Sequence, residues 1–164
     1  MTAARLIVTA AALLGAGALF GASLYDAIVF APNMRGGPEG LEHGRLFMSA
    51  ATPANLFRFL SPATQVLLLA ATVLNWSSPQ RRWPLAGALL ALVVSDAITF
   101  AYHYPRNHLM FDAPMTVDPS RLALAARQWA SANLVRVVLV FGCWLATLSA
   151  LMRLAALRGA GMLD

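Results

Sequence analysis

The chain of 164 residues contains no lysine, a single cysteine and only 7 acidic residues. Charged residues make up 12% of it, whereas a soluble domain has about 25%. One cysteine, Cys143, excludes an intramolecular disulfide and also the quinone-linked disulfide oxidoreductases of similar size, which need cysteine pairs. The mean hydropathy is +0.65. These shortages indicate a single integral membrane domain over residues 1–164.

The net charge of +5 comes entirely from arginine. The arginines are dispersed between hydrophobic stretches and do not form a basic patch, so we expect no nucleic-acid partner. The expected partners are membrane lipid and a hydrophobic small molecule. Assembly into a homo-oligomer or with a membrane partner protein is left open.

Four apolar runs are each long enough to cross the hydrocarbon core, which takes about 20 helical residues. Thr52-Pro53 and Asp118-Pro119 are typical helix starts, with a capping side chain before a proline. The predicted fold is all-α, a bundle of four transmembrane helices. The fourth helix, roughly 58 Å long at 1.5 Å per residue, is expected to extend beyond the membrane. The four helices are predicted at about residues 6–30, 53–74, 85–104 and 119–157.

Two longer loops, residues 31–55 and 105–118, are predicted on one side of the membrane. Prolines and glycines such as Pro32 and Gly37 favour an irregular first half of the first loop. Pro105 disfavours helical geometry at Tyr104, so we expect the third helix to end there.

Four spans place both termini on the side opposite to the two loops. Arginine lies beside the short connection on the termini side, at Arg81 and Arg82, and this pattern is typical of the cytoplasmic face. We therefore expect an integral protein of a bacterial-type inner membrane with both termini in the cytoplasm.

Polar side chains gather near the long-loop ends of three spans. In a regular helix Asp96, Thr99 and His103 share one face, and the same spacing places Trp129 and Arg136 together. The halves of the helices toward the termini side are, by contrast, almost purely aliphatic. The pattern predicts a polar pocket between facing helices, open to the long-loop side. Its predicted members are Tyr25, Asp26, Asp96, Thr99, His103, Asn107, Trp129, Asn133 and Arg136.

Asp96 and Arg136 lie at matching depths, about 12 Å and 10 Å below the long-loop surface by the helical rise. A charge left alone there is costly, so we predict an ion pair between them, with Asp26 as the competing partner. A purely structural pair explains Asp96 as well as a functional role does. A helix-end histidine bonded to a free carbonyl is likewise an alternative for His103.

Three short motifs carry a resemblance to a known family. They are a tyrosine-containing end of the first helix before Pro32, Pro105-x-Asn107, and Trp129-x3-Asn133-x2-Arg136. With its four helices, the chain resembles the anthrone oxygenase-like small membrane proteins, most of which lack an assigned function. The first loop and His108 are not part of the matched pattern.

The resemblance implies a membrane pocket for a flat, apolar, oxygen-bearing molecule of phenolic or quinone type. In the best-known members it implies oxidation of an anthrone to an anthraquinone without an organic cofactor. For such chemistry His103 is the expected base. Arg136 and Asn107 are the expected donors to an oxyanion, and the other pocket residues are expected to contact substrate. No cofactor and no metal are expected in this interpretation.

Two other classes of function stay open. One is a metal or haem site that uses His43, His103 and His108, because imidazole suits copper, zinc and iron. The other is a non-enzymatic membrane subunit or small-molecule binder.

Overall fold

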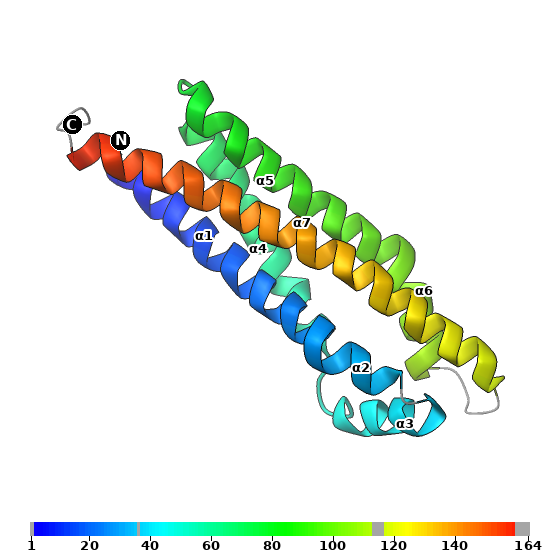
Figure 1. The fold of residues 1–164 in the computed structure, drawn as a ribbon. Helices are drawn as coiled ribbons and strands as arrows, with labels where there is room; N and C mark the ends of the chain where they lie inside the picture. Colours follow the sequence, from blue (N-terminus) through cyan, green and yellow to red (C-terminus); the bar gives the residue numbers. More distant parts are fainter. Residues whose placement is uncertain (1, 36, 113–116, 160–164) are drawn as a thin grey trace.

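The computed structural model describes residues 2–35, 37–112 and 117–159, and within them all regular structure is helical. Four helical segments are long and apolar enough to cross a membrane, and their arrangement is that of an integral membrane protein. They form an elongated bundle with both termini at one end (Figure 1). The predicted all-α four-helix bundle is therefore confirmed. The four segments are Ala3–Met34, Pro53–Leu74, Pro79–Asp112 and Pro119–Leu157.

The first segment is helical from end to end, but its geometry changes along the way. It consists of α1 (Thr2–Tyr25), the π-helical turn η1 (Asp26–Phe30) and α2 (Ala31–Met34). The predicted first helix ended at residue 30, before Pro32. The observed segment continues past Pro32 to Met34.

The prediction of an irregular first half of the first loop is wrong, because that half is largely helical, in the last turn of the first segment and in the start of α3 (Gly37–Phe47). Gly37 precedes Pro38 with a φ of +79°, which only glycine adopts without strain, and Pro38 then suits a first helical turn. The chain reaches α4 (Pro53–Leu74) through a short connection. Its start is as predicted, with Thr52 and Asn55 bonded reciprocally as a capping box.

The third segment consists of α5 (Pro79–Ile98), η2 (Thr99–His103), α6 (Tyr104–Asn107) and η3 (His108–Asp112). It begins before the predicted residue 85, because Pro79 occupies the first turn, where a proline is tolerated. It also continues beyond Pro105, so the predicted end at Tyr104 is wrong. Of the predicted loop 105–118, residues 113–116 lie outside the described part.

A π-helical turn explains how the chain passes each of these two prolines. The N–H of Ala31 donates to the carbonyl of Asp26, and that of Tyr104 donates to the carbonyl of Thr99. Each bond spans five residues and is followed at once by a proline, Pro32 or Pro105. Proline lacks the N–H and crowds the preceding turn. The wider turn leaves room for the proline ring. The helix therefore continues past the proline with a shifted hydrogen-bond register instead of ending.

The last helix, α7 (Pro119–Gly159), has 41 residues and is about 61 Å long at 1.5 Å per residue. It packs against both α1 and α5, while α4 packs against the same two helices from the other side. The predicted helix at residues 119–157 is thus observed at almost its predicted bounds.

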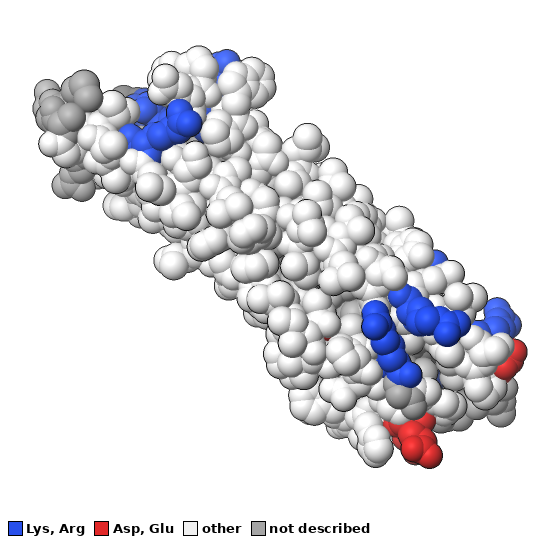
Figure 2. All heavy atoms as spheres, viewed as in Figure 1, with Lys and Arg blue, Asp and Glu red and all other residues white. Residues whose placement is uncertain are grey.

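Charge marks out the layer of the bundle that suits a bilayer. Residues 6–25 of α1 carry no charged side chain, which is about 30 Å of helix and matches a hydrocarbon core. On the face shown in Figure 2 arginines lie at both ends, and the carboxylates lie only at the end that holds α3. Asp26, Asp96 and Arg136 mark the boundary of the uncharged layer on the α3 side.

Two separate apolar cores stabilise the molecule. One joins α1, α4, α5 and α7 in the uncharged layer, around residues such as Leu19, Leu68 and Leu92. The other lies beyond the charged boundary and joins α2, α3, η3 and α7, around Met34 and Met110. The polar residues predicted for the pocket lie at the level between these two cores.

Candidate functional site

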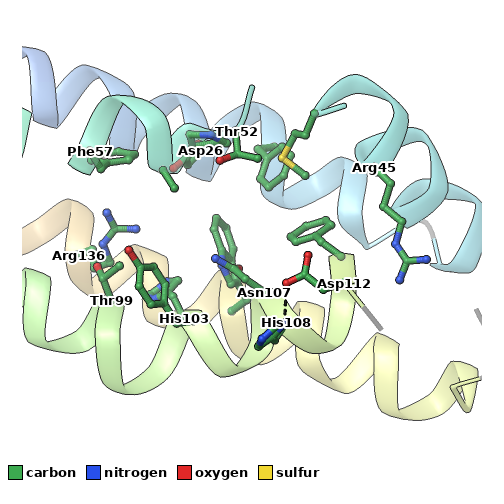
Figure 3. A pocket seen from close by; sticks show the side chains of 17 residues that line it. Asp26, Arg45, Thr52, Phe57, Thr99, His103, Asn107, His108, Asp112 and Arg136 are labelled. Carbon is green, nitrogen blue, oxygen red and sulfur yellow. Dashed lines mark ion pairs between the residues drawn. The ribbon is translucent and has the colours of Figure 1, made fainter. Parts of the chain in front are cut away.

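A cavity of about 470 Å³ opens between the two cores. Asp26 of η1 and Phe57 of α4 border it on one side, and Thr99, His103, Asn107 and Arg136 border it on the other (Figure 3). Phe30 of η1 lines it as well. In the described part α4 packs on α1 and α5 but not on η2, α6 or η3. The cavity occupies that separation. The remaining lining residues are Arg45, Met48, Thr52, Pro53, Ala54, Tyr104, His108, Phe111, Asp112 and Trp129.

The π-helical turns place many of the lining side chains. Asp26 and Phe30 are the first and last residues of η1, and Thr99 and His103 are those of η2. A π-helix advances fewer degrees per residue than an α-helix, so it turns the following side chains away from the face that a regular helix would give them. Single π-helical turns inside α-helices often occur at functional sites.

Aromatic rings form one wall of the cavity. The rings of His103 and Trp129 meet edge to face with centroids 5.1 Å apart, and Trp129 meets Phe30 in the same way at 5.8 Å. Phe30 in turn contacts Phe111 at 6.1 Å. On the facing side Phe57 lies 5.1 Å from the guanidinium carbon of Arg136. These rings suit a flat aromatic molecule, because aromatic pairs favour offset and edge-to-face contacts.

Four residues of the cavity each keep a buried polar atom that has no hydrogen-bond partner among the described residues. The atoms are Nε2 of His103, Oδ1 of Asn107, Nε1 of Trp129 and Nε of Arg136. Buried polar groups are nearly always paired, so such a gathering calls for an explanation. The indole and guanidinium nitrogens are donors, and the amide oxygen is an acceptor.

The contact of His103 with the backbone carbonyl of Ile98 favours one tautomer of the imidazole. Its Nδ1 lies 3.4 Å from the carbonyl oxygen of Ile98. A carbonyl oxygen only accepts, so in the tautomer that forms this hydrogen bond Nδ1 carries the proton and Nε2 keeps its lone pair. His103 is 1% exposed. Its Nε2 is thus a buried ring nitrogen without a hydrogen-bond partner among the described residues.

Arg136 is a buried cation of the site. Its Nη1 donates to Oδ1 of Asn133, and the amide of Asn133 donates to the backbone carbonyl of Ser23. Asn133 is fully buried behind Arg136 and does not line the cavity, so it positions Arg136 and is not placed to contact a ligand. This corrects the prediction that Asn133 contacts substrate.

The predicted ion pair between Asp96 and Arg136 is wrong within the described residues. Oδ2 of Asp96 accepts hydrogen bonds from Ser61 and Gln65 of α4, each at 2.7 Å, and Asp96 does not line the cavity. Arg136 interacts electrostatically with both Asp26 and Asp96, and the described structure gives it no salt bridge within 4 Å. Of the two carboxylates only Asp26, 4% exposed, lines the cavity.

Tyr25 is a third predicted pocket residue that does not line the larger cavity. It is 52% exposed and borders a smaller cavity of about 230 Å³ between η1, α2 and α3, together with His43. Successive residues of a helix point about 100° apart, so Asp26 is buried in the bundle while its neighbour Tyr25 is exposed.

The three-histidine metal site is not assembled. His103 and His108 border the larger cavity, and His43 borders the smaller one. Within the described ranges no three side chains of the metal-binding types converge on one point. His108 instead pairs with Asp112 at 2.6 Å, with both side chains largely exposed at the mouth of the cavity.

Several lining residues could not be found from the polar pattern. Phe30, Phe57 and Phe111 are ordinary apolar residues in apolar runs, and no spacing distinguishes them from lipid-facing positions. Arg45 lies in the second half of the first loop, outside the predicted pocket. In the structure it donates two hydrogen bonds to the carbonyl of Met110, which ties α3 to η3.

These features define a four-helix membrane bundle with an aromatic-walled polar cavity near one boundary of its apolar layer. No family model, curated protein or solved structure matches the chain. The functional argument therefore rests on the cavity itself.

Proposed function

We propose that the protein binds a flat hydroxylated aromatic ketone, of phenolic or quinone type, in the larger cavity and oxidises it with dioxygen. The observation that supports this most is the set of four unpartnered polar atoms in a cavity walled by aromatic rings. Two donors match the carbonyl or phenolate oxygens of such a molecule, and the acceptors match its hydroxyl groups. An apolar pocket with a few convergent polar groups is typical of a small-molecule site.

The proposed reaction converts a ring methylene next to the conjugated system into a ring carbonyl. Nε2 of His103 takes one proton from that carbon, and the electron pair left behind spreads onto the ketone oxygen as an enolate. Arg136 and Trp129 are placed to donate to this oxygen, and such donation is strongest where water is excluded. The electron-rich carbon then reacts with dioxygen.

Dioxygen is the oxidant, and its atoms balance the reaction. One oxygen atom becomes the new ring carbonyl. The other leaves as water with both hydrogens of the methylene group. His103 returns the first of those protons, so the protein ends the cycle unchanged. This is the reaction type implied by the resemblance to the anthrone oxygenase-like proteins.

An oxygen electrode tests the proposal. A dihydroxyanthrone in detergent with the purified protein should consume one dioxygen per anthrone, faster than its spontaneous oxidation. The His103→Gln variant, and protein unfolded by heat, give the background rate. Binding of the matching anthraquinone without any acceleration over background would favour the non-enzymatic binder.

We also propose that the termini face the cytoplasm and that the cavity lies toward the opposite surface of a bacterial-type inner membrane. Arg81 and Arg82 lie beside a short connection at the termini end, as positive charge does on cytoplasmic faces. The cavity would then receive its substrate from the outer leaflet or from the extracytoplasmic side.

A further inference from the structure

The end of the bundle that holds both termini carries arginines, and no carboxylate lies beside them among the residues that the structure describes. Arg5 comes from α1, and Arg81 and Arg82 come from the first turn of α5. Every aspartate and glutamate that the structure describes belongs to the other half of the molecule. Figure 2 shows the same separation, with arginine but no carboxylate on this end of the visible face.

Arg81 is the most unusual of these residues, because its side chain is directed into the bundle. It is only 7% exposed, and its Nε donates to Oδ1 of Asn75, which is fully buried. α1 and α5 are diagonal in the bundle, since each packs on α4 and α7 and not on the other. Arg5 and Arg81 are nevertheless close enough to interact electrostatically. Two like charges therefore lie within electrostatic range of each other at this end of the bundle.

Further unsatisfied groups lie at the same end. Nε of Arg5, Nε of Arg82 and the hydroxyl of Thr9 are buried and have no hydrogen-bond partner among the described residues. α5 has no acidic residue in its first turn, so its positive end adds to the charge of the arginines. Guanidinium and helix N-terminus together favour an anion with several acceptor oxygens.

Two tryptophans place this cluster at the level of lipid headgroups. The guanidinium carbon of Arg82 lies 4.9 Å from the ring of Trp76 and 4.7 Å from that of Trp83. The two tryptophans are 61% and 65% exposed. Exposed tryptophan at the end of a membrane helix is typical of the headgroup region. At this level the anionic group that the membrane itself offers to the cluster is the headgroup of a lipid.

We infer that Arg5, Arg81 and Arg82 form a binding site for the phosphate group of an anionic phospholipid. Arginine recognises phosphate oxygens with paired N–H donors, and basic pockets between membrane helices bind such headgroups. The lipid phosphate would neutralise the repulsion between Arg5 and Arg81. This site is at the opposite end from the larger cavity and does not depend on the oxidation reaction.

Native mass spectrometry and thermal unfolding of the purified protein in detergent test the inference. Phosphatidylglycerol or cardiolipin should stay bound and raise the melting temperature, whereas phosphatidylcholine should do neither. In the Arg5→Gln/Arg81→Gln variant the affinity for the anionic lipid should fall by about tenfold or more. Arg58→Gln and Arg121→Gln, both exposed arginines of the other half, are matched controls that should bind as the unchanged protein does.

Three results would overturn the inference. Equal stabilisation by phosphatidylcholine would remove the role of the headgroup charge. Equal stabilisation by inorganic phosphate alone would show that no lipid is needed. Unchanged affinity in Arg5→Gln/Arg82→Gln, a variant that keeps the buried Arg81 and hence the fold, would place the lipid elsewhere.

One more variant addresses the chain's own acidic end. Asp164 lies outside the described residues, so a chain shortened to residues 1–159 is measured in parallel. It should bind anionic lipid with at least the affinity of the full chain. Loss of lipid binding in the shortened chain would contradict a site made by the three arginines.

Discussion

The imidazole of His103 and the indole of Trp129 meet edge to face, with ring centroids 5.1 Å apart and ring planes at 81°. This contact brings together side chains from two helical segments that border the cavity, because His103 belongs to η2 and Trp129 to α7. Each ring keeps one nitrogen without a partner among the described residues. A ligand that bridges the two nitrogens would explain why neither is paired, and the predictions below depend on that arrangement.

His103→Gln should abolish turnover while the protein still folds and inserts. Glutamine keeps a polar group of similar reach but cannot accept a proton at neutral pH. Loss of a general base typically lowers the rate by about 100-fold or more. Affinity for a non-reacting quinone should change much less. His43→Gln, in the smaller cavity, is the control. If turnover in His103→Gln equals that of the unchanged protein, His103 only bonds the carbonyl of Ile98.

Asp26, and not Asp96, should be the carboxylate that is energetically coupled to Arg136. In a double-mutant cycle Asp26→Asn with Arg136→Gln should show a coupling energy of about 1–3 kcal/mol. The same cycle with Asp96→Asn should give a smaller value, because Ser61 and Gln65 already satisfy that side chain. Unfolding in mixed micelles measures both. A larger coupling for Asp96 would restore the pairing expected from the sequence.

The fold could be predicted from the sequence because hydrophobic length and helix-start signals are local properties. Pro53 and Pro119 each begin a helix where a capping side chain and a proline occur together. The bundle then follows, since four apolar helices of this length have few other ways to bury their polar residues.

The site could be predicted only in part, because the face on which a side chain lies depends on helix geometry. Counting 3.6 residues per turn places Asp96 with His103, but the π-helical turn η2 begins between them. Asp96, which precedes this turn, is hydrogen-bonded to α4, while His103 at the end of the turn borders the cavity. In α7, which is a regular α-helix throughout, the same count correctly placed Trp129 and Arg136 together at the cavity.

Cysteine labelling in intact cells should show that the α3 end faces outward. Ser49 and Ser120 are exposed at that end, and Ser77 is exposed in the connection at the other. Single cysteines at Ser49 and Ser120 should react with an impermeant maleimide, and one at Ser77 should react only after lysis. The native Cys143 is fully buried and gives little background. Thr116 would be an alternative site but lies outside the described residues. The reverse labelling pattern would invert the proposed orientation.

Asp118 should stabilise the start of α7 at neutral pH and lose this effect in acid. Hydrogen bonds from the hydroxyl and the backbone N–H of Ser120 hold the pKa of Asp118 below its ordinary value of 3.8. The folded state therefore favours the ionised form, and its contribution is present above that value and disappears as the pH falls through the lower folded pKa.

Hydrogen exchange measures this contribution at the amides of the first turn of α7. Exchange in Asp118→Ala should be faster than in the unchanged protein at pH 7. The difference should shrink when the equilibrium is measured in strong acid. A difference that persists undiminished there would mean that the ionised carboxylate is not what stabilises the helix start.

The most direct measurement is an equilibrium titration of the purified protein with a dihydroxyanthraquinone, followed by the fluorescence of Trp129. Trp76, Trp83 and Trp144 are first replaced by phenylalanine so that Trp129 is the only emitter. We predict saturable 1:1 quenching. Affinity should fall by about tenfold or more, roughly 1.4 kcal/mol, in Arg136→Gln and should not change in Arg58→Gln. Quenching that does not saturate, or equal affinity in both variants, would contradict a ligand site in this cavity.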